Sequence, residues 1–324
     1  MLVVVGFRAV SRVSVHVYHK SPAAICDLVM QAAPGRRVVP VTSREELLLE
    51  LGDVEVLFAP IPPREGWAGA DRLRLVQLLG AGVDQLLPSP DLPERVEVAG
   101  VRGVFAAEAS EYAMAAMLCL CRRFPALFSD QRERKFRQRA AGTVVGRNLT
   151  IVGLGSIGQR IAYLASAHGM TVTGVCRRPR DIPPVDHVLA VNRLAEALSS
   201  AEYLVVTVPL TPATAGLLSA EMLACLPDGA FLINIARGGI VDEAALIDEL
   251  KSGRLGGAAL DVFEQEPLPE DSPLWNTPNL IVTPHVAGYG QSYVERCVDV
   301  LVENVRRLET GEPRLHLVDR ALGY

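Results

Sequence analysis

A glycine-rich turn between a buried strand and an amphipathic helix constrains the fold of this chain more than any other sequence feature. The strand Asn148–Val152 runs directly into a GxGxxG pattern, and a helical pattern follows. The turn consists of Gly153, Leu154, Gly155, Ser156, Ile157 and Gly158. In such a turn the first glycine allows a tight bend, the second lets phosphates approach the backbone, and the third lets helix and strand pack closely. The pattern predicts a dinucleotide site at the helix N-terminus; the alternative is a glycine-rich turn without a ligand.

The end of the next predicted strand, Thr171–Val175, decides which dinucleotide fits. NAD-binding turns place an acid about 20 residues further on, where it accepts hydrogen bonds from the ribose hydroxyls. Here Cys176 stands at that position, and Arg177 and Arg178 follow. Guanidinium groups bind phosphate bidentately, whereas a carboxylate would repel it. The sequence therefore favours NADP(H), with NAD possible; the alternative is that the arginines lie in a solvated loop and Asp181 supplies the acid.

Short apolar runs alternate with amphipathic stretches along most of the chain, which is typical of parallel sheets covered by helices. Predicted strands in the first hundred residues are Met1–Val5, Val38–Val41, Val54–Ala59, Leu75–Leu79 and Val96–Ala99. Later ones are Asn148–Val152, Thr171–Val175, Tyr203–Val208, Ala230–Ile235, Gly257–Leu260 and Leu280–Val282. Because single cores rarely grow beyond about 250–300 residues, the length of 324 residues suggests two domains.

Two helices are also expected outside the strand series. Glu108–Phe124 is rich in Ala, Met and Leu and is expected to end before Pro125, and Ser292–Leu308 is expected to be the last helix. The basic stretch Asp130–Arg139 is interpreted as a solvated helix face.

Composition excludes several classes of protein. With 32 Lys and Arg against 37 Asp and Glu, the chain lacks the basic field that a dedicated nucleic-acid binder needs. No apolar run reaches the ~18–20 residues that cross a bilayer, and Met1–Val5 is broken too early for a signal peptide. The six cysteines form no CxxC pairs, so we expect neither a metal site nor a disulfide framework, and a cytoplasmic location.

Three segments in the second half carry residues suited to carbonyl reduction, and each follows a predicted strand. They are Asn234–Glu243, Ala259–Pro267 and Thr283–Gly288. The imidazolium of His285 would give a proton to a carbonyl oxygen, and the Glu266 carboxylate would orient its ring. The guanidinium of Arg237 would pair with a substrate carboxylate. Open α/β sheets place ligands at the carboxyl ends of their strands, where these segments begin.

With those residues in view, the sequence resembles the D-isomer-specific 2-hydroxyacid dehydrogenases over nearly its whole length, most specifically from Val144 to Gly288. The resemblance implies that Arg237 binds the substrate, that Glu266 is the partner of the histidine, and that His285 is the acid/base. It further implies that several other residues have roles in binding. Asp261 would lie near the nicotinamide amide, Thr207, Val208 and Pro209 would line the adenine side, and the amides of Gly82 and Val83 would hold the substrate carboxylate.

The resemblance also implies an architecture of two doubly wound parallel-sheet domains. A Rossmann coenzyme domain, residues 101–286, would be inserted in a split flavodoxin-like substrate domain, residues 1–100 and 287–324. Hinges are expected near Gly100–Val104 and His285–Gly290. A homodimer would form through the coenzyme domain, with Glu108–Phe124 and the basic stretch at the interface.

The main hypothesis is an NADPH-dependent reductase that converts a small 2-oxo acid, glyoxylate or hydroxypyruvate, to the D-2-hydroxy acid. The proline-rich Ala59–Pro63 loop, stiff and close to a strand end, favours a small pocket. One alternative is an NAD-linked D-lactate or 3-phosphoglycerate-type dehydrogenase. Another is a non-catalytic dinucleotide sensor, like the transcriptional corepressors of the same fold.

Overall fold

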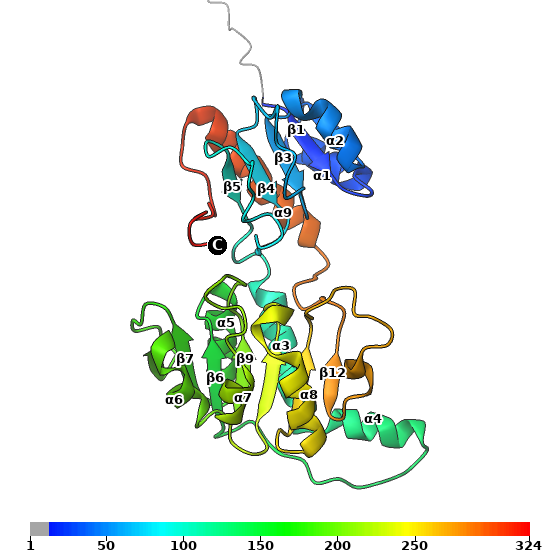
Figure 1. Cartoon of the computed structure of the whole chain (residues 1–324), viewed down its shortest axis with the longest axis vertical. Coiled ribbons are helices and arrows are strands. Elements are labelled where there is room, and N and C mark those ends of the chain that lie inside the picture. The colour runs from blue at the N-terminus through cyan, green and yellow to red at the C-terminus, as the bar shows by residue number, and fades with distance from the viewer. Residues whose placement is uncertain (1–12) are drawn as a thin grey trace, which may run out of the picture. The chain divides into compact units, whose positions relative to one another are not determined.

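The computed structural model describes residues 13–324, so the predicted strand Met1–Val5 lies outside the described residues. The chain divides into two compact units (Figure 1). One comprises residues up to Val104 together with Ser292–Tyr324, and the other comprises Phe105–Gln291.

The smaller unit is built on a parallel five-stranded sheet with the order β2-β1-β3-β4-β5, which is the flavodoxin-like order. Its strands are β1 Val15–Tyr18, β2 Val38–Val41, β3 Val56–Ala59, β4 Leu75–Leu78 and β5 Glu97–Ala99. Its helices are α1 Ala23–Ala32, α2 Arg44–Glu50, the 3-10 helix η1 Leu51–Asp53 and α9 Tyr293–Thr310. The buried side of α9 carries Cys297, Val298, Leu301 and Val305, so the C-terminal segment completes the core of this unit.

The larger unit is built on a parallel seven-stranded sheet with the order β12-β11-β10-β9-β6-β7-β8, which is the Rossmann order with a seventh strand. Its strands are β6 Asn148–Val152, β7 Thr171–Cys176, β8 His187–Ala190, β9 Tyr203–Val206, β10 Phe231–Asn234, β11 Gly257–Leu260 and β12 Leu280–Val282. Its α-helices are α3 Ala106–Cys121, α4 Phe124–Arg132, α5 Ser156–Ala167, α6 Leu194–Leu198, α7 Ala220–Ala224 and α8 Glu243–Ser252. Short 3-10 helices are η2 Val191–Arg193, η3 Gly238–Ile240 and η4 Pro273–Asn276.

Helices cover both faces of the seven-stranded sheet, as the strand pattern requires. In β6, Ile151 packs with residues of α3 and α5, while its neighbour Val152 packs with residues of α6, α7 and α8. Alternate side chains of a strand point to opposite faces, so a nearly continuous apolar strand feeds two cores. Because the helices run back against the strands, the N-termini of α5 and α8 lie at the carboxyl edge of the sheet.

The helix predicted at Glu108–Phe124 corresponds to α3, Ala106–Cys121, and a second helix that was not predicted follows it. The chain breaks at Arg123, whose φ of 58° is left-handed, and α4 begins at Phe124 with Pro125 in its first turn. Proline is tolerated at that position because the first N–H groups of a helix have no intrahelical partner. Pro125 therefore starts a helix rather than ending one.

The interpretation of Asp130–Arg139 as a solvated helix face holds only in part, because residues 131–139 are exposed but the stretch is helical only at its start. The helix ends at Arg132, and the chain that follows folds back onto the buried carboxylate of Asp130. Arg139 donates to both Asp130 oxygens, at 2.6 and 2.9 Å. These bonds are the main reason why the pKa of Asp130 is lowered, and the charges of the neighbouring cations lower it further. The basic stretch is a structured arm.

Candidate active site

The glycine-rich turn has a geometry that only glycine can adopt at two of its positions. Gly153 has a φ of +108°, and a Cβ there would lie 2.9 Å from the Thr207 hydroxyl oxygen. A Cβ on Gly158 would lie 1.9 Å from the Gly153 carbonyl oxygen. The turn and α5 are therefore in direct backbone contact, as the sequence predicts.

The same turn fits the phosphates of a dinucleotide. A Cβ on Gly155 would meet nothing within 4 Å, so the backbone is open there. No side chain caps the N-terminus of α5, which leaves its first N–H groups for an anion. Thr207 donates to the Gly153 carbonyl oxygen at 2.7 Å and so fastens the turn to the end of β9. Ser156 and Ile157 form the first turn of α5, and Val208 and Pro209 continue the loop from Thr207.

Two cationic side chains follow the end of β7, at the position where dinucleotide-binding turns place the residue that contacts the ribose hydroxyls. Cys176 is the last residue of the strand and is partly buried, while Arg177 and Arg178 are exposed. The first carboxylate that follows in the sequence is that of Asp181, which is also exposed.

His285 and Glu266 are brought together. Nδ1 of His285 lies 2.8 Å from Oε2 of Glu266, and Oε1 of Glu266 accepts the N–H of Phe263 at 3.0 Å. An ionised carboxylate only accepts hydrogen bonds, so Nδ1 carries the proton that they share. The His285 side chain is 45% exposed, so Nε2 is the nitrogen open to a substrate. This arrangement can deliver a proton.

Asp261 anchors the loop that carries His285. Its carboxylate is 1% exposed and accepts the Thr283 hydroxyl at 2.6 Å. It also accepts the N–H groups of Val286 at 2.9 Å and Ala287 at 2.7 Å. The Asp261 carbonyl oxygen accepts the N–H of His285, whose φ of 54° is left-handed. These bonds hold a conformation that a non-glycine residue rarely adopts; the predicted contact of Asp261 with nicotinamide stays a prediction.

Tyr112 extends this anchor and was missed in the sequence. Its hydroxyl lies 2.6 Å from Thr283 Oγ1. Because the Thr283 proton goes to Asp261, Tyr112 must be the donor. Burial raises the pKa of Tyr112 to about 12, with the Thr283 bond opposing, so the phenol stays a donor. A single Tyr in an Ala-rich helix gives no indication in the sequence that it donates a hydrogen bond to a distant loop.

Arg237 is placed by a turn that Asn234 shapes at the end of β10. The buried Asn234 side chain accepts the Ala236 N–H and donates to the Arg237 carbonyl oxygen, both at 3.0 Å. The Arg237 side chain is half-buried, and its Nη1 donates to the Ala236 carbonyl oxygen at 2.7 Å. A guanidinium held in this way is oriented before any substrate arrives.

Gly82 and Val83 lie in the smaller unit, in the loop after β4. Tyr293 of α9 donates to the Leu79 carbonyl oxygen at 2.9 Å, and Val101 donates to that of Gly80 at 3.3 Å. The start of the loop is therefore fastened by two other segments. Within residues 13–324, neither the Gly82 nor the Val83 amide donates a backbone hydrogen bond, so both suit a carboxylate ligand.

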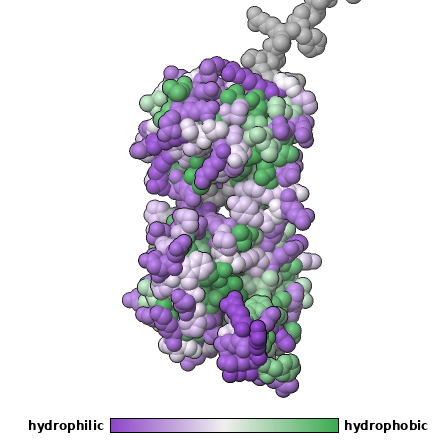
Figure 2. Space-filling model, turned by 90° about the vertical axis from the view of Figure 1, so that its right-hand side faces the viewer, coloured by the Kyte–Doolittle hydropathy of each residue, from purple (hydrophilic) through white to green (hydrophobic). Residues whose placement is uncertain are grey.

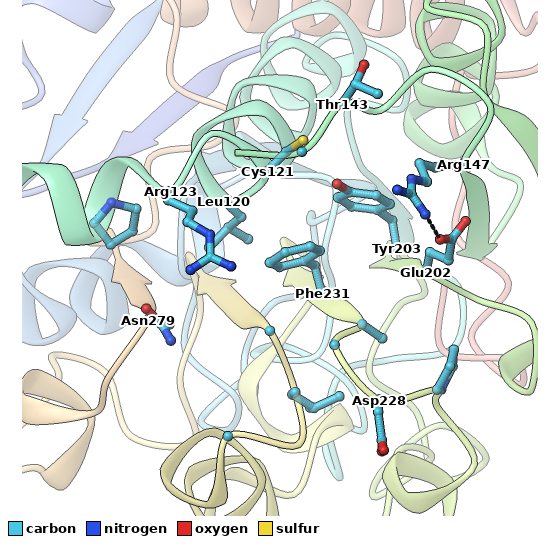
Figure 3. Close-up of a pocket in the computed structure, with 18 of the residues that line it drawn as sticks. Leu120, Cys121, Arg123, Thr143, Arg147, Glu202, Tyr203, Asp228, Phe231 and Asn279 are labelled. Carbon is cyan, nitrogen blue, oxygen red and sulfur yellow. Dashed lines mark hydrogen bonds and ion pairs between the residues drawn. The ribbon is translucent and has the colours of Figure 1, made fainter. Parts of the chain in front are cut away.

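A cavity of about 530 Å³ lies at the opposite, amino edge of the seven-stranded sheet (Figure 3). Tyr203 and Phe231, the first residues of β9 and β10, stack there with ring centroids 5.1 Å apart. Arg147 and Glu202 form an ion pair of 2.6 Å at its wall. None of the residues predicted to bind or react lines this cavity.

Residues 13–324 contain no group of three or more His, Cys, Asp or Glu side chains arranged to hold a metal ion. In the same range, every helix is too short or too polar to pass through a membrane.

Comparison with known proteins gives the class to which this fold and site belong. Residues 114–287 match the family "D-isomer specific 2-hydroxyacid dehydrogenase, NAD binding domain". The chain therefore belongs to the D-isomer-specific 2-hydroxyacid dehydrogenases and is an NAD(P)-dependent oxidoreductase.

Individual members of this family are similar to the chain over most of its length. Glyoxylate/hydroxypyruvate reductase A of Salmonella paratyphi C (strain RKS4594) is 35% identical over 273 residues, which cover 81% of this chain and 85% of that protein. A D-isomer specific 2-hydroxyacid dehydrogenase from Xanthobacter autotrophicus Py2, solved with NADPH and MES, is 35% identical with a TM-score of 0.87, over 96% of this chain and all of that one. The NADPH-dependent glyoxylate/hydroxypyruvate reductase of Sinorhizobium meliloti, solved with NADP and sulfate, is 31% identical with a TM-score of 0.87 and the same coverage.

Proposed function

We propose that the protein reduces a small 2-oxo acid of the glyoxylate or hydroxypyruvate type to the D-2-hydroxy acid, with NADPH as the reductant. The observation that carries this proposal is the 2.8 Å bond between His285 and Glu266, on a loop that Asp261 anchors. This bond orients the His285 ring as a proton donor, and the ring is partly exposed in a unit whose fold binds dinucleotides. The names of the relatives support the substrate class.

The residues of the chain divide the work of the reaction. NADPH, when bound, supplies the hydride. His285 gives the proton on Nε2 to the substrate oxygen, and the Glu266 carboxylate stabilises the charged ring before transfer. Arg237 pairs with the substrate carboxylate, and its charge polarises the neighbouring carbonyl group. In the smaller unit, the amides of Gly82 and Val83 are proposed to bind a carboxylate.

The preference for NADPH rests on the end of β7. Arg177 and Arg178 are exposed directly after Cys176, and the residue in the acid's place is a thiol. Two guanidinium groups stabilise a 2′-phosphate, and without a carboxylate at 176 nothing at that position repels it. The relatives from Xanthobacter and Sinorhizobium were solved with NADPH and NADP, which agrees with this preference.

A spectrophotometric screen of 2-oxo acids against NADPH and NADH tests the proposal. We expect the highest kcat/KM with glyoxylate or hydroxypyruvate and NADPH. A preference for NADH would overturn the cofactor assignment and leave the reaction class intact. Tight dinucleotide binding without turnover of any 2-oxo acid would instead support a dinucleotide sensor.

We infer that the enzyme is a homodimer joined through the larger unit. Helix α4 and the arm extend from this unit and expose phenylalanine rings, including Phe124, Phe128 and the 99% exposed Phe136 (Figure 1). Figure 2 faces the end of α4 and shows hydrophobic and strongly hydrophilic side chains together on the lower part of the larger unit. Exposed apolar groups beside charged ones are typical of an interface.

Sedimentation velocity tests the dimer. One chain has a mass of 34.9 kDa, and the wild-type protein should sediment as a species of about twice that mass. The double variant Phe124→Ser, Phe128→Ser should shift towards the monomer, whereas Tyr163→Ser, an exposed ring on α5, should not. A monomeric wild-type chain would contradict the inference.

We further propose a cytoplasmic location. All six cysteines are free thiols, which suits a reducing compartment. Cell fractionation with an antibody against the chain would test this.

A further inference from the structure

Glu243, the first residue of α8, forms a bond that the mechanism above does not use. Its Oε1 accepts the N–H of Glu264 at 2.6 Å. The preceding amide in the same loop, that of Phe263, donates to Glu266. We call residues 262–266 the Glu266 loop. Two adjacent amides of this loop are thus held by two glutamates, one from inside the loop and one from α8.

The turn after Arg237 touches the same peptide group. A Cβ on Gly238 would lie 1.8 Å from the carbonyl carbon of Phe263 and 2.2 Å from the nitrogen of Glu264. Only glycine lets the two backbones come this close. Gly238 and Glu243 therefore hold the Phe263–Glu264 peptide from two points a few residues apart on one segment.

The position of Glu243 is electrostatically unfavourable unless this bond compensates for it. Burial raises the pKa of Glu243, and the charges of Glu264 and Glu266 raise it further, while the bond from the Glu264 amide lowers it. A half-buried acid beside two others costs stability when ionised. The helix does not need this side chain as a cap, because Asp242 already accepts the Ala245 N–H at 2.9 Å.

We propose that Glu243 is a positioning residue, which latches the Glu264 amide so that the Glu266 carboxylate faces His285. The inference rests on the proposed function of Glu266 and His285. The latch also connects the segment that carries Arg237 to the loop that carries Glu266. The groups for the substrate carboxylate and for the proton would thus be held in one arrangement before the substrate binds.

A matched pair of substitutions isolates the hydrogen-bond acceptor. Glu243→Gln keeps an oxygen that can accept the Glu264 N–H, whereas Glu243→Met has a similar length and no such oxygen. We expect Glu243→Met to lower kcat by about tenfold, since a charge-assisted bond contributes roughly that much. The KM for the 2-oxo acid and the Kd for NADPH should change by less than about twofold, and Glu243→Gln should keep kcat within about twofold.

A spectroscopic readout keeps the latch testable apart from the reaction. The ring ¹⁵N chemical shifts of His285 report its bond to Glu266. They should move in Glu243→Met and stay in Glu243→Gln, whether or not the chain reduces 2-oxo acids. Asp248→Ala, which removes an exposed carboxylate from the same helix, is the control and should change neither shifts nor kcat.

The outcomes separate the two proposals. Unchanged shifts and kcat in Glu243→Met, or equal losses in Glu243→Met and Glu243→Gln, would overturn the latch. If Glu243→Met does not fold, Glu243→Ala is judged by the same criteria. Shifts that move as expected, in a chain whose turnover does not depend on His285, would support the latch and overturn the proposed reaction.

Discussion

The two edges of the seven-stranded sheet use charged groups in different ways. At the amino edge, Arg147 and Glu202 pair with each other beside the stacked rings of Tyr203 and Phe231, and Glu202 also accepts the N–H of Asn148 at 3.0 Å (Figure 3). At the carboxyl edge, the carboxylates bind backbone amides of neighbouring loops, as Asp261 does with Val286 and Ala287. The amino-edge carboxylate shares its charge with a cation, whereas the Asp261 carboxylate bonds a hydroxyl and amides and so fixes a loop conformation.

The difference follows from the direction of the helices. Helix N-termini meet the carboxyl edge and bring N–H groups and positive dipole ends, which suit phosphates and carboxylates. Helix C-termini, such as that of α3, meet the amino edge and do not. A cavity is therefore a weaker guide to chemistry in this fold than the direction of its strands.

Among substitutions at the two edges, His285→Ala at the carboxyl edge should have the largest effect on turnover. Removing the proton donor should lower kcat by ~10²–10⁴-fold, since general acid catalysis contributes about that much. The fold should not change, because the His285 backbone makes the anchoring bonds. Steady-state kinetics and circular dichroism check this, with His187→Ala in the edge strand β8 as the control. A variant that keeps its kcat would contradict the assignment of His285.

A smaller effect is expected from Arg177→Ala, also at the carboxyl edge. Losing a guanidinium that pairs with the 2′-phosphate should weaken NADPH binding by about tenfold or more and leave NADH binding nearly unchanged. Titration of intrinsic fluorescence with each dinucleotide measures the two Kd values. Equal losses for both would mean that Arg177 does not meet the phosphate.

Tyr112→Phe should affect stability more than turnover. The Thr283 hydroxyl oxygen loses its donor, so the free energy of unfolding should fall by about 1 kcal/mol at neutral pH. Burial raises the pKa of Tyr112 from 10.0 to about 12. Between these values the unfolded chain has lost this proton and the folded chain still holds it, so wild-type stability falls as pH rises.

Denaturant titrations at a series of alkaline pH values check the Tyr112 prediction. The difference in unfolding free energy between wild type and variant should shrink as pH rises from about 10 to about 12. Comparing the two proteins cancels the other groups that titrate there. A difference that does not depend on pH would show that the phenol titrates normally.

The smallest effect is expected at the amino edge. Arg147→Met breaks the ion pair with Glu202, and because both side chains are substantially exposed the cost should be no more than about 1 kcal/mol. Turnover should stay within about twofold of wild type. A loss of kcat comparable to that of His285→Ala would show that the amino edge takes part in the chemistry.

Most of the larger unit could be predicted from the sequence because its strands are apolar on both faces. Each strand predicted after residue 147 has a counterpart in β6, β7, β9, β10, β11 or β12. The edge strand β8, His187–Ala190, is only half-buried and gave no such signal. In the smaller unit β1, Val15–Tyr18, was missed because its alternation includes a buried histidine, His16.

The site was predictable where residue type alone suggests chemistry. Glu266 and His285 are a carboxylate and an imidazole in segments that follow strands, and the structure brings them together. The roles of Tyr112 and Glu243 were not predictable, because they depend on which hydrogen-bond partners tertiary packing brings close to these side chains. The Gly238 contact also needs the fold, since a glycine in a turn has many reasons to be there.

Helix α9 has a consequence for the order in which the protein becomes structured. It contributes Cys297, Val298 and Leu301 to the core of a unit whose sheet is made of the first hundred residues. During synthesis, the continuous unit that follows Val104 can close its core while α9 is still unmade. The N-terminal strands must then wait for the end of the chain, with apolar surface exposed to chaperones and proteases. Ribosome-bound chains cut short before residue 292 should therefore be protease-resistant only in the part that binds the dinucleotide.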